Sequence, residues 1–440
     1  MTDTAQGDKT GAAVPSRRLA RVGRFGRLGA GVAGSVIAGG TRQALKGEKP
    51  VLNDLLLTPT NAARVADELS QLRGAAMKMG QLLSMDAGDL VPPELSAILG
   101  RLRSSAHSMP PKQLRRVLDQ AWGPGWLRRF ERFDLQPVAA ASIDQVHRAR
   151  LPGGTDLAIK VQYPGVRESI NSDVDNVALL VKMTGLLPKD VDIAPLLAEG
   201  KAQLKEEADY EREAACMARF GALLEGDDRF VLPAPHEELT TPDVLAMTYL
   251  RGEPIDTLSD APQDRRDAVV GALMDLLLSE LFTFRFMQTD PNFANYFVRE
   301  DGTLALLDFG ASREVPKRLS DGYKALLRAG MTNDMEAVHA AAVHLGIAGE
   351  DLSEEHGAVM TELFGHVMEP MRADGPFDFG ASDLGARIRD QGMALRTGGF
   401  HHVPPPVTMF LHRKIVGVYL MATNLRARVD VGALLRPHLA

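Results

Sequence analysis

Three polar residues in the second half of the chain stand at intervals that limit how it can fold. Asn295 follows Asp290 by five residues, and Asp308 begins the tripeptide Asp308-Phe309-Gly310. Between Asn295 and Asp308, short apolar runs lie on both sides of the turn dipeptide Asp301-Gly302, which predicts a β-hairpin. Amide and carboxylate oxygens are ligands that Mg²⁺ prefers, so the spacing predicts a magnesium site.

The same order of residues is typical of sites that transfer phosphoryl groups. Such chemistry needs one carboxylate near the attacking oxygen and two oxygen ligands for magnesium bound to the phosphates. In kinase-type sites the carboxylate is an Asp, an Asn follows five residues later, and Asp-Phe-Gly lies beyond a short hairpin. We therefore predict Asp290 as the catalytic carboxylate, and Asn295 and Asp308 as the metal ligands. Asp-Phe-Gly alone is weak evidence, because strands often end in such a turn, so the combined spacing carries the interpretation.

Lys160 is the candidate phosphate-binding lysine. It lies in the clearest predicted strand, 157–162, upstream of the metal ligands, where a kinase-type lysine reaches the α- and β-phosphates. A strand lysine on its own is more often a solvated surface residue. Such a lysine needs a helical glutamate to hold it. The acidic run 206–213 contains the candidates, although a solvated helix face explains most of its members.

The hydrophobic pattern changes along the chain. Before residue 130 apolar residues recur at helical spacing, and from Phe130 short alternating runs separated by Gly and Pro indicate an antiparallel sheet. After a linker at 250–254 the pattern is mainly helical. The predicted helices are 61–83, 94–103, 112–121, 193–224, 264–286, 321–329, 335–345, 353–371 and 410–428; the predicted strands include 142–151, 156–162 and two within 231–249.

A small β-rich part followed by a large helical part predicts an α+β, protein-kinase-like fold with two lobes. An N-terminal helical extension precedes the lobes. The expected domains are a basic flexible leader at 1–49, the helical extension at 50–129, a kinase-like N-lobe at 130–250 and a mostly helical kinase-like C-lobe at 251–440.

Charge is unevenly distributed. The net charge is −7, but residues 1–49 contain nine Lys and Arg against three Asp and Glu, which leaves −13 for the rest. An acidic body argues against a nucleic-acid partner, because such binding depends on neutralising phosphates. The single cysteine, Cys216, excludes an internal disulfide and a cysteine-cluster metal site, which suits a reducing compartment.

The basic leader leaves three interpretations open. Ser16-Arg17-Arg18 before the Gly-rich apolar run 28–40 fits a twin-arginine export signal, a membrane-surface anchor or a flexible tail. The run has 13 residues, which is too short to span a bilayer. No other segment is long and apolar enough, so we predict no transmembrane helix and expect a cytoplasmic protein with peripheral attachment to the inner face of the membrane.

Four sequence blocks resemble the AarF/UbiB family of atypical protein-kinase-like proteins, the group that supports ubiquinone biosynthesis. Lys78-Met79-Gly80-Gln81 resembles the family's Lys-x-Gly-Gln motif, and Ala139-Ala140-Ala141-Ser142 with Gln145-Val146-His147 resembles its Ala-rich loop. Glu207-Ala208-Asp209-Tyr210 resembles its Glu-x-Asp motif. The fourth block is the Asp290, Asn295 and Asp308 set, and the resemblance runs from about Leu57 to the C-terminus.

The resemblance implies roles for residues that spacing alone does not assign. It implies that Glu207 pairs with Lys160, with Glu213 as the second choice, and that Lys78 and Gln81 lie near the nucleotide, Lys78 reaching either Glu207 or the phosphates. Ala139, Ala140, Ala141 and Ser142 would cover the phosphates of ATP or ADP. Alanine allows less backbone freedom than the glycine usual in kinases, so altered nucleotide preference and weak protein phosphorylation are implied.

Some positions depart from the family pattern. Asp144 stands where the family usually has Gly, and Asn292, Phe293 and Ala294 replace a common His-Pro-Gly. None of these changes removes a proposed metal ligand or the catalytic carboxylate.

Three functions fit the sequence. The favoured one is an Mg²⁺-dependent ATPase or unorthodox kinase that supports ubiquinone biosynthesis at a membrane, with isoprenoid quinone intermediates, membrane lipid and quinone-biosynthesis proteins as partners. The second is a phosphotransferase acting on a protein or small molecule. The third is a pseudokinase scaffold, against which the intact Asp290, Asn295 and Asp308 set counts.

Overall fold

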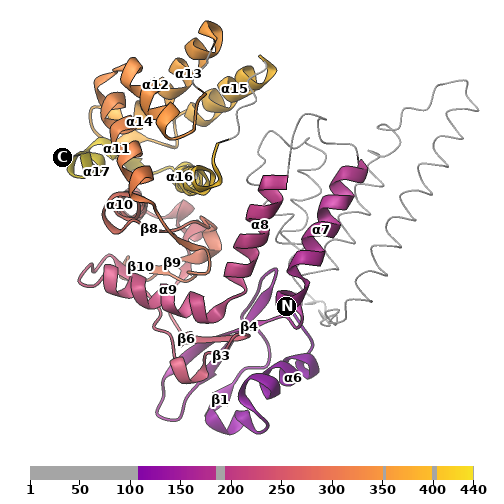
Figure 1. Ribbon diagram of the computed structural model, residues 1–440. Helices are drawn as coiled ribbons and strands as arrows, with labels where there is room; N and C mark the ends of the chain where they lie inside the picture. The colour runs from indigo at the N-terminus through magenta and orange to yellow at the C-terminus, as the bar shows by residue number, and fades with distance from the viewer. Residues whose placement is uncertain (1–107, 185–193, 350–352, 399–403, 440) are drawn as a thin grey trace, which may run out of the picture. The chain divides into compact units, whose positions relative to one another are not determined.

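The computed structural model describes residues 108–184, 194–349, 353–398 and 404–439 (Figure 1). The chain divides into two compact units. Among the described residues, the first unit contains 108–215 and 234–249, and the second contains 216–233 and everything from Leu250 onward. The predicted helices at 61–83 and 94–103, the leader, Lys78 and Gln81 lie outside the described residues.

The first unit is built on an antiparallel sheet with strand order β1-β3-β4-β6, and β2 pairs with β3. These strands are β1 (Arg132–Phe133), β2 (Ala139–Ala140), β3 (Asp144–Arg150), β4 (Asp156–Gln162) and β6 (Val244–Thr248). The predicted strand 156–162 is confirmed with the same bounds. Because Lys160 lies opposite Val146 on β3 and Leu245 on β6, it stands on the central strand with neighbours on both sides.

Helix α6 (Pro111–Trp122) and the short turn η3 (Trp126–Arg129) supply apolar side chains to the core of this unit. The helix confirms the prediction at 112–121, and it begins at a proline, which suits the first turn of a helix. Leu114, Leu118 and Trp126 are buried together with Leu157 and Ile159 of β4. One face of the central strand is thereby fixed in the core.

The helical pattern predicted at 193–224 is confirmed, and it is divided into two helices. Helix α8 (Ala194–Glu207) ends before Ala208, and α9 (Tyr210–Leu223) starts again after Asp209. The carboxylate of Asp209 accepts a hydrogen bond from the backbone N–H of Arg212 (3.1 Å), as an N-cap does, which gives α9 its own starting register. Another helix, α7 (Val166–Thr184), follows β4 and was not predicted.

The second unit is mainly helical. Its α-helices are α10 (Gln263–Ser279), α11 (Lys317–Thr332), α12 (Met335–His344), α13 (Glu354–Val367), α14 (Glu369–Arg372), α15 (Leu384–Thr397), α16 (Pro406–Asn424) and α17 (Val431–Leu439). The helix predicted at 264–286 ends earlier: α10 passes into the π-helical segment η6 (Glu280–Phe284), which stops at the positive-φ residue Arg285. The helices predicted at 321–329 and 335–345 are confirmed, and that at 353–371 is divided at Met368. The helix predicted at 410–428 ends earlier, at Asn424, and Arg428 belongs to the strand β13 (Arg428–Val429).

Two small sheets of the second unit hold the functional loops. One has the strand order β5-β10-β9-β7, and in the other β8 pairs with β11. Their strands are β5 (Phe230–Val231), β7 (Glu253–Pro254), β8 (Phe286–Gln288), β9 (Tyr296–Val298), β10 (Leu304–Leu306) and β11 (Ser312–Glu314). Strands β9 and β10 form the predicted hairpin.

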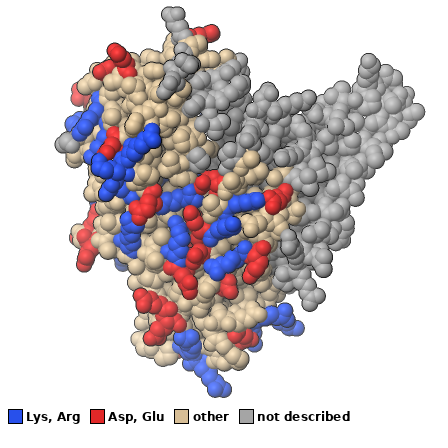
Figure 2. Space-filling model, viewed as in Figure 1, with Lys and Arg blue, Asp and Glu red and all other residues tan. Residues whose placement is uncertain are grey.

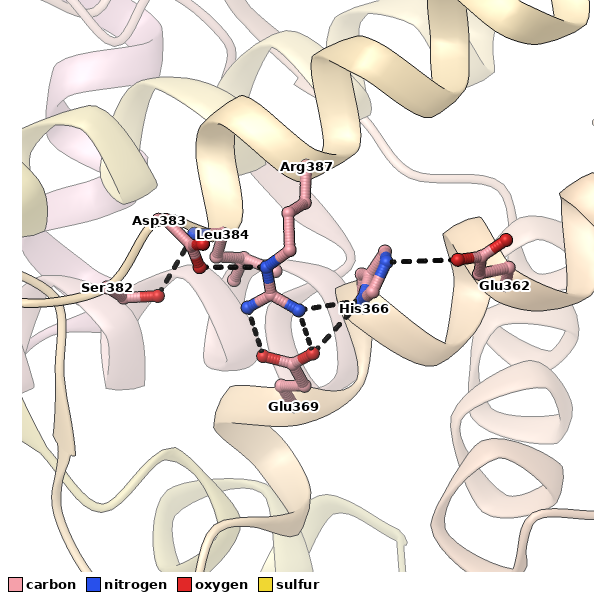
Figure 3. A network of polar contacts seen from close by, with 7 residues as sticks. All are labelled: Glu362, His366, Glu369, Ser382, Asp383, Leu384 and Arg387. Carbon is pink, nitrogen blue, oxygen red and sulfur yellow. Dashed lines mark hydrogen bonds and ion pairs between the residues drawn. The ribbon is translucent and has the colours of Figure 1, made fainter.

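A polar network ties three C-terminal helices together (Figure 3). The guanidinium of Arg387 on α15 donates hydrogen bonds to both carboxylate oxygens of Glu369 on α14. It also donates one to Asp383 Oδ1 at 2.8 Å. His366 on α13 lies 3.0 Å from the same Glu369 carboxylate. The hydrogen bonds from Arg387 lower the pKa of Glu369 to about 2.

The surface carries mixed charge, and on the face drawn in Figure 2 basic side chains lie interspersed with acidic ones. Several exposed charges of the described residues are paired, among them Arg219 with Glu314 and Lys317 with Asp321. Exposed pairs of this kind contribute about 0–1 kcal/mol each. Within the described part of the chain, no helix has the length and apolar character needed to cross a bilayer.

Candidate functional site

Lys160 lies in a buried group of opposite charges in the first unit. Its ammonium nitrogen is 3.0 Å from both carboxylate oxygens of Glu213 and 3.8 Å from Asp144 Oδ2. It also lies 5.4 Å from the ring centroid of Tyr210. The Glu213 side chain is fully buried and the Lys160 side chain is 11% exposed. A bidentate contact of this kind holds the lysine in one position, as a phosphate-binding lysine requires.

The partner of Lys160 is therefore Glu213, and the prediction that Glu207 forms this pair was wrong. Glu207 is the last residue of α8, and its carboxylate accepts a hydrogen bond from Gln203 one turn earlier at 3.0 Å. Glu213 belongs to α9, the helix that Asp209 starts in a new register. The family motif did not reveal this break, whereas the helix-capping preference of Asp209 was a signal in the sequence.

Asp144 reaches Lys160 because of the sheet register. Asp144 pairs with Gln162, and Lys160 pairs with Val146, so the two charged residues are diagonal neighbours on one face of β3 and β4. Burial raises the pKa of Tyr210, and the neighbouring carboxylate of Asp144 adds to the shift. Where the family usually has Gly, this chain thus places a second carboxylate beside its candidate phosphate-binding lysine.

The Ala-rich segment forms a tight hairpin. Ala139 and Ala140 are β2, Ala141 N–H donates to the carbonyl of Asp144 at 2.8 Å, and Ser142 is buried in the turn. The hairpin leads directly into β3, the neighbour of the strand that carries Lys160.

The Gln145-Val146-His147 part of this motif is structural. Gln145 Oε1 accepts a hydrogen bond from Met109 N (2.7 Å), and its amide nitrogen contacts His147 Nε2 at 2.7 Å. His147 Nδ1 lies 2.8 Å from the carbonyl of Asp134. Burial lowers the pKa of His147, and these contacts are satisfied by the neutral ring with its proton on Nδ1. The side chains of Gln145 and His147 thus attach β3 to Met109, which precedes α6, and to Asp134, which follows β1.

Asp290 and Asn295 occupy one loop of the second unit, between β8 and β9. The amide nitrogen of Asn295 donates to the carbonyl of Asp290 at 3.1 Å, and so does the amide nitrogen of Gln288 at 2.9 Å. The first of these bonds uses the nitrogen of the Asn295 amide, which leaves Oδ1 as its candidate metal ligand. Both the Asp290 and Asn295 side chains are partly exposed, as residues that contact a substrate must be.

Asp308 is held next to this loop by two strand pairings. The hairpin β9–β10 joins Asn295 to Leu307, whose N–H donates to the Asn295 carbonyl at 3.0 Å. Beyond Asp308, β11 pairs with β8, and Thr289 bonds the Ala311 carbonyl. The three predicted residues Asp290, Asn295 and Asp308 thus come from segments that are tied together by backbone hydrogen bonds.

The Asp-Phe-Gly turn is locked from both sides. Gly310 N–H donates to Asp308 Oδ1 at 3.1 Å. Phe309 is 1% exposed and packs on Phe220 with ring centroids 5.3 Å apart, and Phe220 in turn packs on Phe286 at 5.0 Å. The aromatic stack anchors the turn while its aspartate stays partly exposed.

This donor set fits magnesium bound to a nucleotide. One carboxylate and one amide oxygen are hard ligands, and Mg²⁺ usually takes only one or two protein ligands beside phosphates and water. In the described part of the chain no group of three or more His, Cys, Asp or Glu could form an all-protein metal cage.

Comparisons with known proteins show which family the chain resembles. Residues 101–342 match the ABC1 atypical kinase-like domain. The chain is 36% identical to the Saccharomyces cerevisiae protein named atypical kinase COQ8, mitochondrial, over 96% of this chain and 85% of that protein. It is 39% identical to the Rattus norvegicus protein named atypical kinase COQ8B, mitochondrial, over 94% of this chain and 79% of that protein.

A solved structure shares the fold. The complex of Rv3197 with erythromycin from Mycobacterium tuberculosis superposes with a TM-score of 0.60 at 24% identity, and the match covers 86% of this chain and 95% of that one.

Proposed function

The chain belongs to the ABC1 atypical kinase-like family, and from this premise we propose that it binds Mg-ATP and Mg-ADP and supports ubiquinone biosynthesis at a membrane. The match to the ABC1 domain and the similarity to the COQ8 proteins confirm the predicted resemblance to the AarF/UbiB family. Together with the solved structure they confirm the predicted kinase-like α+β fold. The family also makes the chain a kinase- or ATPase-type enzyme. The nucleotide, the metal and the lipid pathway are what we propose.

The observation that carries the proposal is the arrangement of Asp290, Asn295 and Asp308. Strand pairings and backbone hydrogen bonds tie the segments that bear them, which suits two metal ligands and one carboxylate acting on the same phosphate. Asn295 Oδ1 and the Asp308 carboxylate would hold Mg²⁺, which neutralises charge on the phosphates. Asp290 would orient the attacking hydroxyl or water and accept its proton.

Lys160 would contact the phosphates, with Glu213 as its positioning partner. Ala139, Ala140, Ala141 and Ser142 would cover the phosphates as a hairpin whose alanines restrict the backbone. Lys78 and Gln81, which we place near the nucleotide, lie outside the described residues.

Asp308→Asn tests the metal site. An amide is a weaker ligand than a carboxylate for this hard cation, so we expect at least a tenfold loss of Mg-ADP affinity, about 1.4 kcal/mol. Isothermal titration calorimetry measures it. Asp301→Asn is the matched control, since Asp301 caps the turn of the same hairpin through Thr303 N–H and an Asn keeps that bond. Equal Mg-ADP affinity of the Asp308→Asn and unchanged proteins would exclude the metal role.

The quinone role is proposed from the COQ8 names of two relatives and from the resemblance to AarF/UbiB proteins. Quinone and intermediate profiling of a deletion strain, complemented with the unchanged chain or with Asp290→Asn, tests it. We expect ubiquinone to be lost in the deletion and restored only by the unchanged chain. Normal quinone levels in the deletion strain would reject the role in ubiquinone biosynthesis and would not affect the proposal that the chain binds Mg-nucleotide.

Peripheral membrane attachment is proposed through residues 17–46, where six arginines precede or flank the apolar run. Each basic residue near an anionic surface contributes about 1 kcal/mol, and salt weakens the attraction. Sedimentation with anionic and neutral vesicles should pellet the full chain with anionic vesicles, and a chain starting at Lys49 should stay in solution. If both proteins pellet equally, the leader is not the anchor.

A further inference from the structure

Helix α16 carries a lysine that is almost completely buried. Lys414 is 2% exposed, and its ammonium nitrogen lies 3.1 Å from Tyr296 OH, 3.3 Å from Gln288 Oε1 and 3.4 Å from Glu280 Oε2. An ammonium has three N–H donors, and here it meets three oxygens from three different segments. Burial works against the charge, but the Glu280 carboxylate and Tyr296 hydroxyl outweigh it and raise the pKa of Lys414.

Two of these partners are the residues at the ends of the catalytic loop. Gln288 is the residue before Thr289, and Tyr296 is the residue after Asn295. A single ammonium therefore joins both ends of the 289–295 loop. The third partner, Glu280, also accepts a hydrogen bond from the backbone N–H of Gln288 at 3.2 Å, which holds the first end a second time.

The side chain of Gln288 links Lys414 to Asp290. The Gln288 amide uses its oxygen for Lys414 and its nitrogen for the carbonyl of Asp290, at 2.9 Å. That carbonyl is the acceptor that Asn295 also uses. Lys414 thus orients the Gln288 amide, and the amide orients the backbone of the candidate catalytic residue.

The same helix touches the loop a second time, one turn further on. A Cβ added to Gly417 would lie 2.2 Å from Cβ and 2.3 Å from Cγ of Pro291, the residue after Asp290. Glycine is unfavourable inside a helix, and here only glycine leaves room for Pro291. This steric contact is independent of the polar network and lies on the same loop.

We propose that Lys414 and Gly417 of α16 are positioning residues that hold the Asp290 loop in its reactive conformation. The inference rests on the proposed function. Lys414 contacts both ends of the Asp290 loop and Gly417 lies against Pro291 within it, whereas the Asp308 carboxylate accepts its hydrogen bond from Gly310 N–H. Both should therefore govern turnover more than nucleotide affinity. A displacement of about 1 Å from the reactive geometry lowers rates by about 100-fold.

Gly417→Ala is the principal test, because it pushes Pro291 without altering a charge. We expect kcat for ATP hydrolysis to fall about 10- to 100-fold with the KM for ATP within about threefold. Hydrogen exchange of peptides covering 289–295 should become faster, while that of the Lys160 strand stays unchanged. Gly392→Ala in α15 is the matched control, since a Cβ there meets nothing within 4 Å.

Lys414→Met tests the polar network, and it leaves the Glu280 carboxylate buried without its main partner. If that protein does not fold, the double variant Lys414→Met with Glu280→Gln removes both charges together. We expect the same loss of kcat in whichever of the two folds. Lys414→Arg should recover part of kcat, because it restores the cation.

Several outcomes overturn the inference. A folded Gly417→Ala protein with unchanged kcat does so, and so does a KM that rises more than kcat falls. Unchanged kcat in the folded double variant also rejects the role of Lys414. If the unchanged chain neither binds Mg-ADP nor hydrolyses ATP, the proposed function fails and the inference fails with it. Activity in the unchanged chain with no effect of either substitution rejects the inference alone.

Discussion

The substitution Glu213→Gln is expected to destabilise the first unit by about 2–3 kcal/mol. The amide keeps the shape of the side chain and removes its charge. Breaking a buried ion pair costs about 3–5 kcal/mol, because one charge remains without compensation. Glu213 is fully buried and 3.0 Å from Lys160, but Asp144 lies 3.8 Å from the same ammonium and compensates part of its charge. Because of this second carboxylate, the loss of stability that we expect is smaller than the usual range for a broken buried ion pair.

Urea unfolding followed by tryptophan fluorescence measures this loss. The chain has two tryptophans, Trp122 and Trp126, and both pack in the core of the first unit, so the signal reports the unit that contains Lys160. A double-mutant cycle with Lys160→Met isolates the pair itself. We expect a coupling energy of about 2 kcal/mol between Lys160 and Glu213, and less than about 0.5 kcal/mol between Lys160 and Glu207.

The cycle separates the two glutamates even if Glu207→Gln has an effect of its own. Glu206→Gln is the matched control, because Glu206 lies 3.8 Å from Arg212 in a partly exposed pair and should cost less than about 1 kcal/mol. A coupling of Lys160 to Glu207 that exceeds its coupling to Glu213 would refute the assignment.

Three further changes are predicted. Ala140→Gly should alter the ratio of ATP to ADP affinity and raise radiolabel incorporation from ATP by increasing backbone freedom in the hairpin; unchanged values of both would place the phosphate-covering loop elsewhere. Asp144→Asn should tighten Mg-ADP binding about threefold to tenfold in calorimetry, because it removes a negative charge 3.8 Å from Lys160, and weaker binding would contradict this. Arg387→Gln should cost about 1 kcal/mol in urea unfolding followed by circular dichroism near pH 7, since Glu369 is partly exposed. Because Arg387 depresses the pKa of Glu369 to about 2, this cost should disappear as pH falls from about 4.5 towards 2, and a constant cost would exclude the pair as its cause.

The sequence predicted the strand of Lys160 and the hairpin between Asn295 and Asp308 because both depend on local patterns. Alternation of apolar residues sets a strand, and Asp301-Gly302 sets a turn. Which glutamate pairs with Lys160 depends instead on the register of the helix that carries it. One break at Asp209 separates Glu207 from Glu213, and continuous helical periodicity across 193–224 concealed it.

The residues that hold the Asp290 loop are less evident from the sequence than the residues within it. A loop without regular hydrogen bonding must be fixed by side chains from distant segments, and α16 lies more than a hundred residues after Asp290 in the sequence. Yet Lys414 falls at helical spacing from the apolar residues Leu411, Val418 and Met421, and a charge on such a face is expensive unless it has partners. A lone cation on the apolar face of a helix therefore indicates a buried polar network. In this chain the network ends at the carbonyl of the residue that we propose as catalytic.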